Sequence, residues 1–493
     1  MTVKKPLRGR QIGVALMSVV VALAGCASVD RQTVVESGKA APQWYSALPH
    51  GGSVENLTKW WEQLSDPLLV KLMEAAQTES PSIAAAASRM AGAYAVRTQT
   101  GAAQLPNLDL TASKSRSVST PGFTTLPITM QQAGVQMSWE LDVMGQRQAG
   151  KQAAQMRLES AIANWHDART MMAAEVALTY LNYRFCNALL TYSEIDLTSR
   201  KESARLAGLT EKAGLLAGGN AALIQSAAAD TANRVLAERK ECDVMVKELV
   251  ALTAITEPEL RRELDANKKH ADRLLADTKW LNSLFSIGQI PGQVLTQRPD
   301  IFTAQNDVIA AAYDVDASKA ARWPRLSLNG FIGHGRSTIP GSGGLSGTTE
   351  LTVWTAGPLA LSMPILDWGT RSAQVDAAKA RYEEATLGYR AKVRNAVREV
   401  EEALLHLQNT ADRLQAANQS AEGYRRSFAA NEAKFKAGLA SQNDLEDANR
   451  ALAAGERGLL GVQRERLIAW IELYRAAGGG WTPDAVLQAE LKN

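Results

Sequence analysis

The sequence contains few of the residues that enzymes and metalloproteins use for chemistry. It has 5 histidines and 3 cysteines among 493 residues. The histidines show neither metal-ligand spacing nor the pattern of a catalytic triad; they are His50, His166, His270, His334 and His406. The glycine-rich segment 340–347 lacks the Gly-Lys-Ser/Thr ending of a phosphate loop. We therefore expect no catalysis, no metal site and no cofactor.

Long apolar runs are missing after the amino-terminal segment. No run beyond residue 25 approaches the roughly 18 to 20 apolar residues of a membrane-spanning helix. The run at residues 12–22 is too short to span a membrane, and a basic stretch with Lys4, Lys5, Arg8 and Arg10 precedes it. This arrangement is typical of a secretory signal peptide, so we expect residues 1–25 to be removed on export.

The signal ends in Leu-Ala-Gly-Cys26, which resembles a bacterial lipobox. The motif predicts cleavage before Cys26 and lipidation of its thiol; the alternative is a plain signal peptide followed by an incidental cysteine. Ala27 stands where inner-membrane retention usually requires Asp, so we expect a lipid anchor in the outer membrane.

A strong net charge is also absent. The formal charge is +3 at pH 7, and residues 1–25 carry four basic residues and no acid, so the exported chain has a charge of −1. The basic character belongs to the signal, and nothing indicates nucleic acid as a partner.

Proline is absent from residues 369–437, and the stretch has only two interior glycines. Apolar residues recur there at intervals of three and four among many Ala, Arg, Glu and Gln, which predicts one long amphipathic helix. Roughly 68 residues at 1.5 Å each would reach about 100 Å. Because no ordinary globular core is that wide, the helix must belong to a coiled-coil array or a tube.

The chain contains this unit twice. Gly145-Gln-Arg147 precedes Gly369-Thr-Arg371 by 224 positions, and Lys212-Ala-Gly-Leu215 precedes Lys436-Ala-Gly-Leu439 by the same distance. Such self-similarity indicates a tandem duplication of helix, β-hairpin, long helix, turn and return helix. The predicted segments are the signal (1–25), a tether and equatorial segment (26–80), repeat 1 (81–255, with β-hairpin 107–141 and helical hairpin 145–254), a connector (256–297), repeat 2 (298–477, with β-hairpin 325–363 and helical hairpin 369–477) and a tail (478–493).

Two β-hairpins give four strands, and four strands cannot close a barrel. Unpaired strand edges are not tolerated in hydrocarbon, so strands that cross a membrane would have to be pooled by several chains. Three chains would supply about twelve strands, within the range of outer-membrane barrels. The alternative is a soluble α+β protein with two small hairpins packed on helices. The helix length and the export signal favour the tube.

Several spaced motifs resemble the TolC-like outer membrane factors, and the lipobox suggests their NodT-type lipoprotein branch. These motifs are Ser138-Trp-Glu-Leu-Asp-Val-Met-Gly-Gln-Arg147, Gln297-Arg-Pro-Asp-Ile301, Pro364-Ile-Leu-Asp-Trp-Gly-Thr-Arg371 and Lys436-Ala-Gly-Leu439. The resemblance implies an α+β membrane protein that trimerises into a 12-stranded β-barrel joined to an α-helical periplasmic tunnel. It also implies the outer-membrane exit duct of a tripartite RND-type efflux pump, with a periplasmic adaptor and an inner-membrane transporter as partners, exporting small toxic compounds or drugs.

The resemblance places a candidate periplasmic gate just after the second helical turn. The matching acids are Asp444 and Asp447, six and nine residues beyond Gly438. Threefold symmetry would turn each into an acidic ring selective for cations. The alternative is that Asp444 completes a capping box with Ser441. Asn220 occupies the equivalent of Asp444 in the first repeat, so the two repeats would contribute unequally.

The two helical turns are the candidate adaptor contacts. By the resemblance, Gly214, Leu215, Gly438 and Leu439 lie at hairpin tips that meet the adaptor. Glycine there also supplies a left-handed helix cap, and both roles can hold together.

Cys186 and Cys242 are the cysteines that remain beside Cys26. Each lies 28 residues from Gly214, so a helical hairpin that turns there places them near one another. Packed helices can bring such residues within disulfide reach, and the periplasm is oxidising. We expect a disulfide; the alternative is two buried thiols. Thr410 and Arg466 occupy the equivalent positions in the second repeat.

Two other functions fit the same architecture. One is an exit duct for type I protein secretion, and the other is a periplasmic helical scaffold lipoprotein without a pore. The motifs favour the efflux duct over both.

Overall fold

A computed structural model describes residues 65–119, 126–271, 295, 297–339 and 347–482. The predicted signal peptide, Cys26, most of the connector and the glycine-rich loop 340–346 lie outside these residues. The chain divides into two compact units, which are described separately. The strand unit contains Ala95–Arg157 and Asp307–Leu387, and the helix unit contains the described residues before Ala95, then Leu158–Asn306 and the chain from Gly388 onward.

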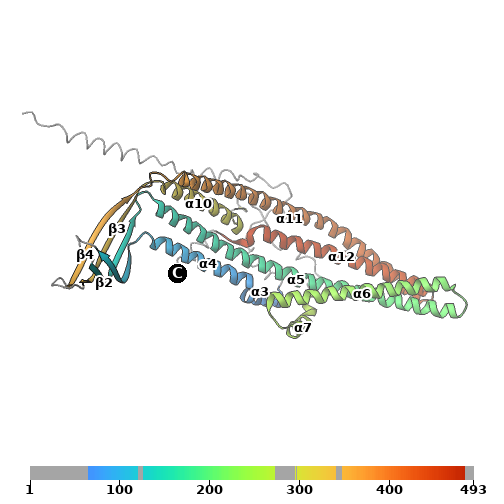
Figure 1. The fold of residues 1–493 in the computed structure, drawn as a ribbon. Helices are drawn as coiled ribbons and strands as arrows, with labels where there is room; N and C mark the ends of the chain where they lie inside the picture. Colours follow the sequence, from blue (N-terminus) through green and yellow to red (C-terminus); the bar gives the residue numbers. More distant parts are fainter. Residues whose placement is uncertain (1–64, 120–125, 272–294, 296, 340–346, 483–493) are drawn as a thin grey trace, which may run out of the picture. The chain divides into compact units, whose positions relative to one another are not determined.

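The order of elements repeats along the chain (Figure 1). The first series is α3 (Pro67–Glu79), α4 (Pro81–Ala102), β1 (Asn107–Ser119), β2 (Leu126–Leu141), α5 (Gln146–Lys212), α6 (Gly218–Thr253) and α7 (Glu257–Ala266). The second is α10 (Pro299–Ala320), β3 (Arg325–Ile339), β4 (Gly347–Ser362), α11 (Thr370–Lys436), α12 (Gln442–Ala476) and the short 3₁₀ helix η4 (Gly478–Gly480). The helices α5 and α11 have 67 residues each, so each is about 100 Å long, as the sequence predicts.

The strand unit holds one antiparallel sheet in the order β1-β2-β3-β4. Residues that pair directly across strands share a face, and successive residues alternate between faces. One face is apolar and exposed over several rows, which include the row Leu110, Val135, Ile332 and Trp354. The other face is mainly polar or small; in the row Asp109, Gln136, Phe331 and Thr355, only Phe331 is large and apolar. Neither edge strand of this described sheet has an outer partner.

Two glycines on the polar face are required by close packing. Gly134 and Gly333 pair across β2 and β3, and a Cβ atom on either would lie within 2.5–2.7 Å of the opposite backbone and of the Phe331 ring. The ring therefore covers the space that two side chains would otherwise fill.

The junction of sheet and helix explains one of the family-like motifs. Arg147, at the start of α5, donates to Glu140 Oε2 of β2 at 2.8 Å and to the carbonyl of Ala103 at 2.6 Å. The Trp139 indole donates to the carbonyl of Gln104 at 3.0 Å. These bonds join β2 and the start of α5 to the residues that follow α4, so Trp139, Glu140 and Arg147 of the motif orient the hairpin on its helices.

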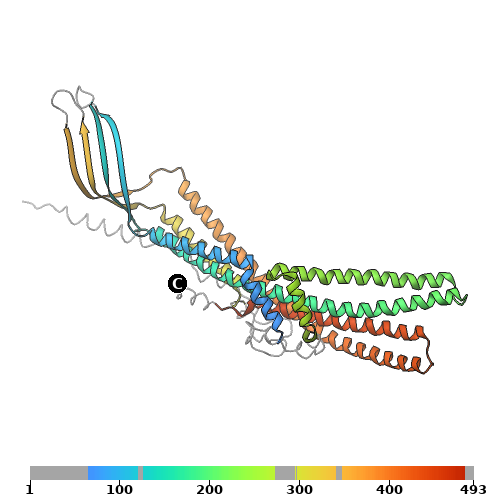
Figure 2. The same ribbon diagram turned by 90° about the horizontal axis from the view of Figure 1, so that it is seen from below.

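The helix unit is built on two helical hairpins, α5 with α6 and α11 with α12, whose turns lie at the same end (Figure 2). Its core is apolar; the largest fully buried side chains include Trp470, Tyr180 and Phe185. Most of the hairpin stability comes from this burial rather than from helix propensity.

Arg298 organises the start of α10. Its guanidinium donates to both carboxylate oxygens of Asp300 at 2.9 Å, to Glu399 Oε2 of α11 at 2.8 Å and to the carbonyl of Ala476 at 2.8 Å. Gly478 follows closely, with φ +81°, and a Cβ atom there would lie 2.4 Å from the carbonyl oxygen of Gln297. The Gln-Arg-Pro-Asp-Ile motif is therefore a clamp that holds α10, α11 and the end of α12 together.

In the described part of the chain, no helix combines the length and the apolar character needed to cross a membrane.

Candidate functional site

The two hairpin turns have the same backbone geometry. After α5, the N–H of Gly214 donates to the Glu211 carbonyl at 2.9 Å and that of Leu215 to the Thr210 carbonyl at 2.8 Å. After α11, Gly438 and Leu439 make the same pair of bonds, to Phe435 at 2.9 Å and Lys434 at 2.8 Å. This is the Schellman motif, and it needs the positive φ of +71° at Gly214 and +70° at Gly438.

The leucines at the turns are not explained by the cap. A Schellman motif usually packs the residue after the glycine on an apolar residue of the last turn. The last-turn residues available here are Thr210 or Leu209 for Leu215, and Lys434 or Ala433 for Leu439; the two leucines nevertheless remain 80% and 79% exposed. Both tips thus present a large apolar side chain to solvent in a geometry that does not require it.

The return helices begin differently. In α12, Ser441 Oγ accepts from the N–H of Asp444 at 3.2 Å, and Asp444 Oδ2 accepts from the N–H of Ser441 at 2.9 Å, which completes a capping box. The side-chain hydrogen bond from Ser441 and then its backbone bond hold the pKa of Asp444 below its usual value. In α6, the N-cap residue Ala217 offers no side-chain bond, and Asn220 lies exposed on the first turn.

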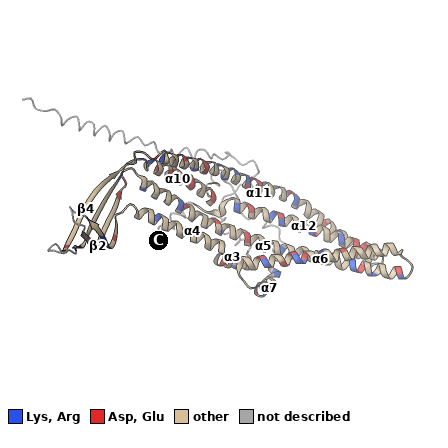
Figure 3. Cartoon of the chain, viewed as in Figure 1, with Lys and Arg blue, Asp and Glu red and all other residues tan. Residues whose placement is uncertain are grey.

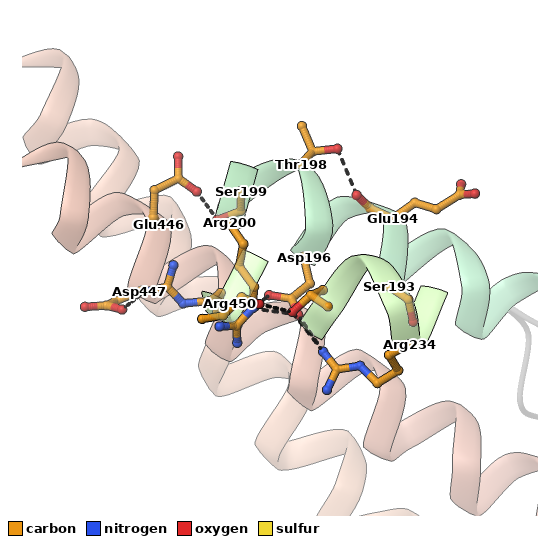
Figure 4. A network of polar contacts seen from close by, with 12 residues as sticks. Ser193, Glu194, Asp196, Thr198, Ser199, Arg200, Arg234, Glu446, Asp447 and Arg450 are labelled. Carbon is orange, nitrogen blue, oxygen red and sulfur yellow. Dashed lines mark hydrogen bonds and ion pairs between the residues drawn. The ribbon is translucent and has the colours of Figure 1, made fainter. Parts of the chain in front are cut away.

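Asp447 lies one turn further along α12, on the same face as Asp444. Its side chain is 71% exposed and forms an ion pair with Arg450 of the same helix. Figure 4 shows this carboxylate pointing away from α5. The predicted gate residues are thus exposed, and one of them also caps its helix.

The neighbouring acid, Glu446, faces the other way and joins the two hairpins. It is buried and accepts hydrogen bonds from Ser199 Oγ of α5 and, at 2.6 Å, from Gln442 Nε2 (Figure 4). About three turns later, Arg457 of α12 bonds Ser193 of α5 and Glu238 of α6, the latter at 2.7 Å. We call this set the inter-hairpin cluster; it consists of Glu446, Ser199, Gln442, Arg457, Ser193 and Glu238. Sequence reasoning missed it; the one available signal was a third acid beside Asp444 and Asp447.

A second polar group lies within the first hairpin. Asp196 of α5 accepts from Arg200 Nε at 3.1 Å and from Arg234 Nη2 of α6 at 3.2 Å (Figure 4). Its carboxylate is nearly buried, so the two guanidinium groups compensate its charge.

The structure joins Cys186 of α5 and Cys242 of α6 in a disulfide, with a Cα–Cα distance of 5.6 Å. This is the pairing that the hairpin geometry predicts. At the equivalent place in the second hairpin, Arg466 Nη1 donates to Thr410 Oγ1 at 3.5 Å and to the Leu407 carbonyl at 2.7 Å. The first repeat is therefore fastened covalently where the second uses hydrogen bonds.

A buried polar group near the start of the helix unit was also missed. Asp66 caps α3 and accepts hydrogen bonds from the Tyr180 hydroxyl at 2.5 Å and from Asn267 Nδ2 at 2.8 Å. Burial raises the pKa of Tyr180, so the hydroxyl stays protonated and donates. The sequence gives no sign of these two partners, which lie more than a hundred residues away along the chain.

Among the described residues, no group of three or more His, Cys, Asp or Glu side chains is placed to hold a metal ion. The site therefore combines exposed acidic residues on α12, exposed leucines at the hairpin turns, and buried hydrogen bonds that join the helices.

The model of the outer membrane efflux protein family matches residues 72–253 and 290–479. The chain belongs to the outer membrane efflux protein family. Its two matched ranges correspond to the two copies of the duplicated unit. It is an outer-membrane efflux channel protein of the TolC-like type, with the α-helical and antiparallel-strand fold of that family.

Relatives and a solved structure agree with this assignment. The chain is 27% identical over 488 residues to the pyoverdine export outer membrane protein OpmQ of Pseudomonas aeruginosa, covering 95% of this chain and 97% of that one. It is 26% identical to nodulation protein T of Rhizobium leguminosarum bv. trifolii, covering 88% and 91%. The solved outer-membrane channel OprN has a similar fold, with a TM-score of 0.71, 23% identity and coverage of 92% and 96%.

Proposed function

We propose that three copies of this chain form the exit duct of a tripartite RND-type efflux pump. In this assembly the three four-stranded sheets join edge to edge into a barrel of about twelve strands. The lipidated Cys26 anchors the chain in the outer membrane, and the long helices form a tunnel in the periplasm. A periplasmic adaptor and an inner-membrane transporter deliver small toxic compounds or drugs to it.

The observation that carries this proposal is the sheet of the strand unit. One face exposes apolar side chains over several rows, and both edge strands lack an outer partner among the described residues. In hydrocarbon, unpaired strand edges cost several kcal/mol for each unsatisfied group, so the sheet needs partners at both edges. Identical copies supply these partners and leave the apolar faces toward lipid.

The proposed constriction lies at the start of α12. Asp444 and Asp447 are exposed on one face of this helix, close to the hairpin turn, and threefold symmetry would arrange them in two acidic rings. The inter-hairpin cluster holds α12 to the first hairpin, so opening would require a change in these contacts. Asn220 brings no charge to the rings, which makes the second repeat the main contributor.

The exposed tip leucines are the proposed adaptor contact, and this role is testable. Replacing Leu215 and Leu439 with Asp should abolish efflux while leaving the trimer and its conductance intact. Each leucine buried in an interface contributes about 1.5–3 kcal/mol, so adaptor binding should weaken at least about tenfold. The measurement is drug resistance restored to a strain that lacks its own outer-membrane efflux channels.

A suitable control is Leu236→Asp, because this exposed leucine of α6 lies away from the tips. Full resistance with the double tip variant, or equal loss with the control, would rule out the tips as the adaptor contact.

A further inference from the structure

The apolar face of the sheet gives way to charged residues toward the hairpin loops. On this face the rows nearest the helices are apolar from edge to edge; one of them is Leu110, Val135, Ile332 and Trp354. Two rows further toward the hairpin loops, the residues that pair across the strands are Lys114, Gln131, Arg336 and Glu350. Arg116 follows on β1, and His334 precedes Arg336 on β3. Figure 3 shows how few charged residues the strands otherwise carry.

The distance along β3 places this row at a membrane boundary. Leu326 is the first residue of the apolar face on β3, and Arg336 lies ten residues beyond it. At about 3.3 Å per residue and a strand tilt of about 40°, the rise is about 25 Å. That is the height of the apolar band of an outer-membrane barrel. The helices leave from the opposite end of the strands, so the charged row belongs to the outer leaflet.

The charge of this row is positive. Lys114 and Arg336 of this row oppose one acid, Glu350, and Arg116 lies in the next row on the same face, so the two rows together have a formal charge of +2 for each chain. Arg336 Nε lies 3.8 Å from Glu350 Oε1, and these side chains are 53% and 59% exposed. The adjoining loop segments 120–125 and 340–346 contain no charged residue in the sequence that would neutralise the row. A shallow depression of about 570 Å³ lies over Lys114, Gln131, His334 and Arg336.

We propose that Lys114, Arg116 and Arg336, the basic row, bind the phosphate groups of the outer-leaflet glycolipid, lipopolysaccharide. The inference rests on the proposed function, because it needs the apolar face to be turned toward lipid. Arg and Lys are the side chains that bind phosphate, and a guanidinium can do so through two parallel hydrogen bonds. At the edge of the hydrocarbon such pairs gain from a lower dielectric than that of water. Acyl chains on the apolar rows and sugar phosphates on the basic row would occupy one continuous surface.

The test compares lipopolysaccharide binding to the purified trimer with binding to a Lys114→Gln/Arg336→Gln variant. Glutamine keeps part of each side-chain stem and removes the charge, so the exposed sheet should fold normally. The control variant Lys240→Gln/Lys379→Gln removes the same charge from the exposed helices α6 and α11. Native mass spectrometry should show lipopolysaccharide bound at least about tenfold more weakly to the sheet variant and unchanged on the control, because only the sheet variant loses charge-assisted contacts to phosphate.

Parallel titrations with phosphatidylglycerol and with inorganic phosphate identify the source of the phosphate. The proposal predicts that the two glutamine substitutions weaken the binding of phosphatidylglycerol and of inorganic phosphate less than they weaken the binding of lipopolysaccharide. It fails if the sheet variant retains lipopolysaccharide, if phosphatidylglycerol binding falls by the same factor, or if inorganic phosphate alone occupies the row as tightly. Planar-bilayer conductance separates the two proposals: a conducting trimer whose sheet variant still binds lipopolysaccharide overturns only the lipid site, whereas a folded wild type that never conducts overturns the duct.

Discussion

Replacing Arg298 with methionine is expected to destabilise the helix unit by about 3–5 kcal/mol, because the substitution leaves partly buried carboxylates without their partner. In the wild type, the Arg298 guanidinium donates hydrogen bonds to Asp300, to Glu399 and to the carbonyl of Ala476. Arg298→Lys should recover part of the loss, since an ammonium group keeps the charge but cannot reach all three partners at once. Thermal unfolding of the detergent-solubilised protein, followed by the circular dichroism of its helices, measures the difference.

Arg298→Met should also reverse the way in which the stability of the helix unit depends on pH. Burial raises the pKa of Asp300, but the hydrogen bond and charge of Arg298, with a smaller contribution from Lys392, lower it overall. A lowered folded pKa means that Asp300 stabilises the wild type above the unfolded pKa of about 3.9 and loses this effect as the pH falls through the folded value. Without Arg298, burial dominates, so the variant should gain stability on acidification where the wild type does not. If the stability of the two proteins changed with pH in the same way, the proposed role of Arg298 as the partner of Asp300 would be wrong.

Removing the disulfide should loosen the first helical hairpin and leave the second unchanged. The bridge spans 56 residues of sequence, and closing a loop of this length restricts the unfolded chain by about 4 kcal/mol. The Cys186→Ser/Cys242→Ser variant should therefore lose amide-exchange protection in α5 and α6, toward the turn at Gly214. Wild-type protein treated with reductant should behave in the same way.

The second hairpin is the internal control for this experiment, because Thr410 and Arg466 stand where the first has cysteines. Protection in α11 and α12 should not change. Equal loss in both hairpins would indicate a global effect, and no loss in either would show that apolar packing alone holds the first hairpin closed.

Much of the fold could be predicted because its signals are local. The proline-free stretch 369–437 forms the 67-residue helix α11. The turns at Gly214 and Gly438 require glycine because their φ angles are positive. The cysteine pairing followed from equal distances to one turn. Four strands without closure pointed to an assembly of several chains, which the proposed function retains.

The contacts between hairpins could not be predicted in the same way. Glu446 and Ser199 are 247 residues apart, and their bond depends on how α12 is rotated against α5. Periodicity identifies a buried helix face but does not show which polar residue on it meets which partner. The partners of Asp66, which are Tyr180 and Asn267, could not be predicted for the same reason. The sequence motif around Arg298 indicated a family resemblance but did not show the three partners of its side chain.

The acidic positions on α12 have two roles that one set of variants can separate. Ser441→Ala removes the cap and keeps both carboxylates, whereas Asp444→Asn/Asp447→Asn removes the charges and keeps the side-chain size. If the acids form selective rings, only the second variant should change ion selectivity. If Asp444 only caps the helix, neither variant should.

Single-channel conductance in planar bilayers tests the exit duct most directly. We expect the purified, lipidated trimer to show a small cation-selective conductance, and the Asp444→Asn/Asp447→Asn variant to lose that preference. A well-folded oligomer that inserts into the bilayer and carries no current would contradict the duct and favour a helical scaffold without a pore.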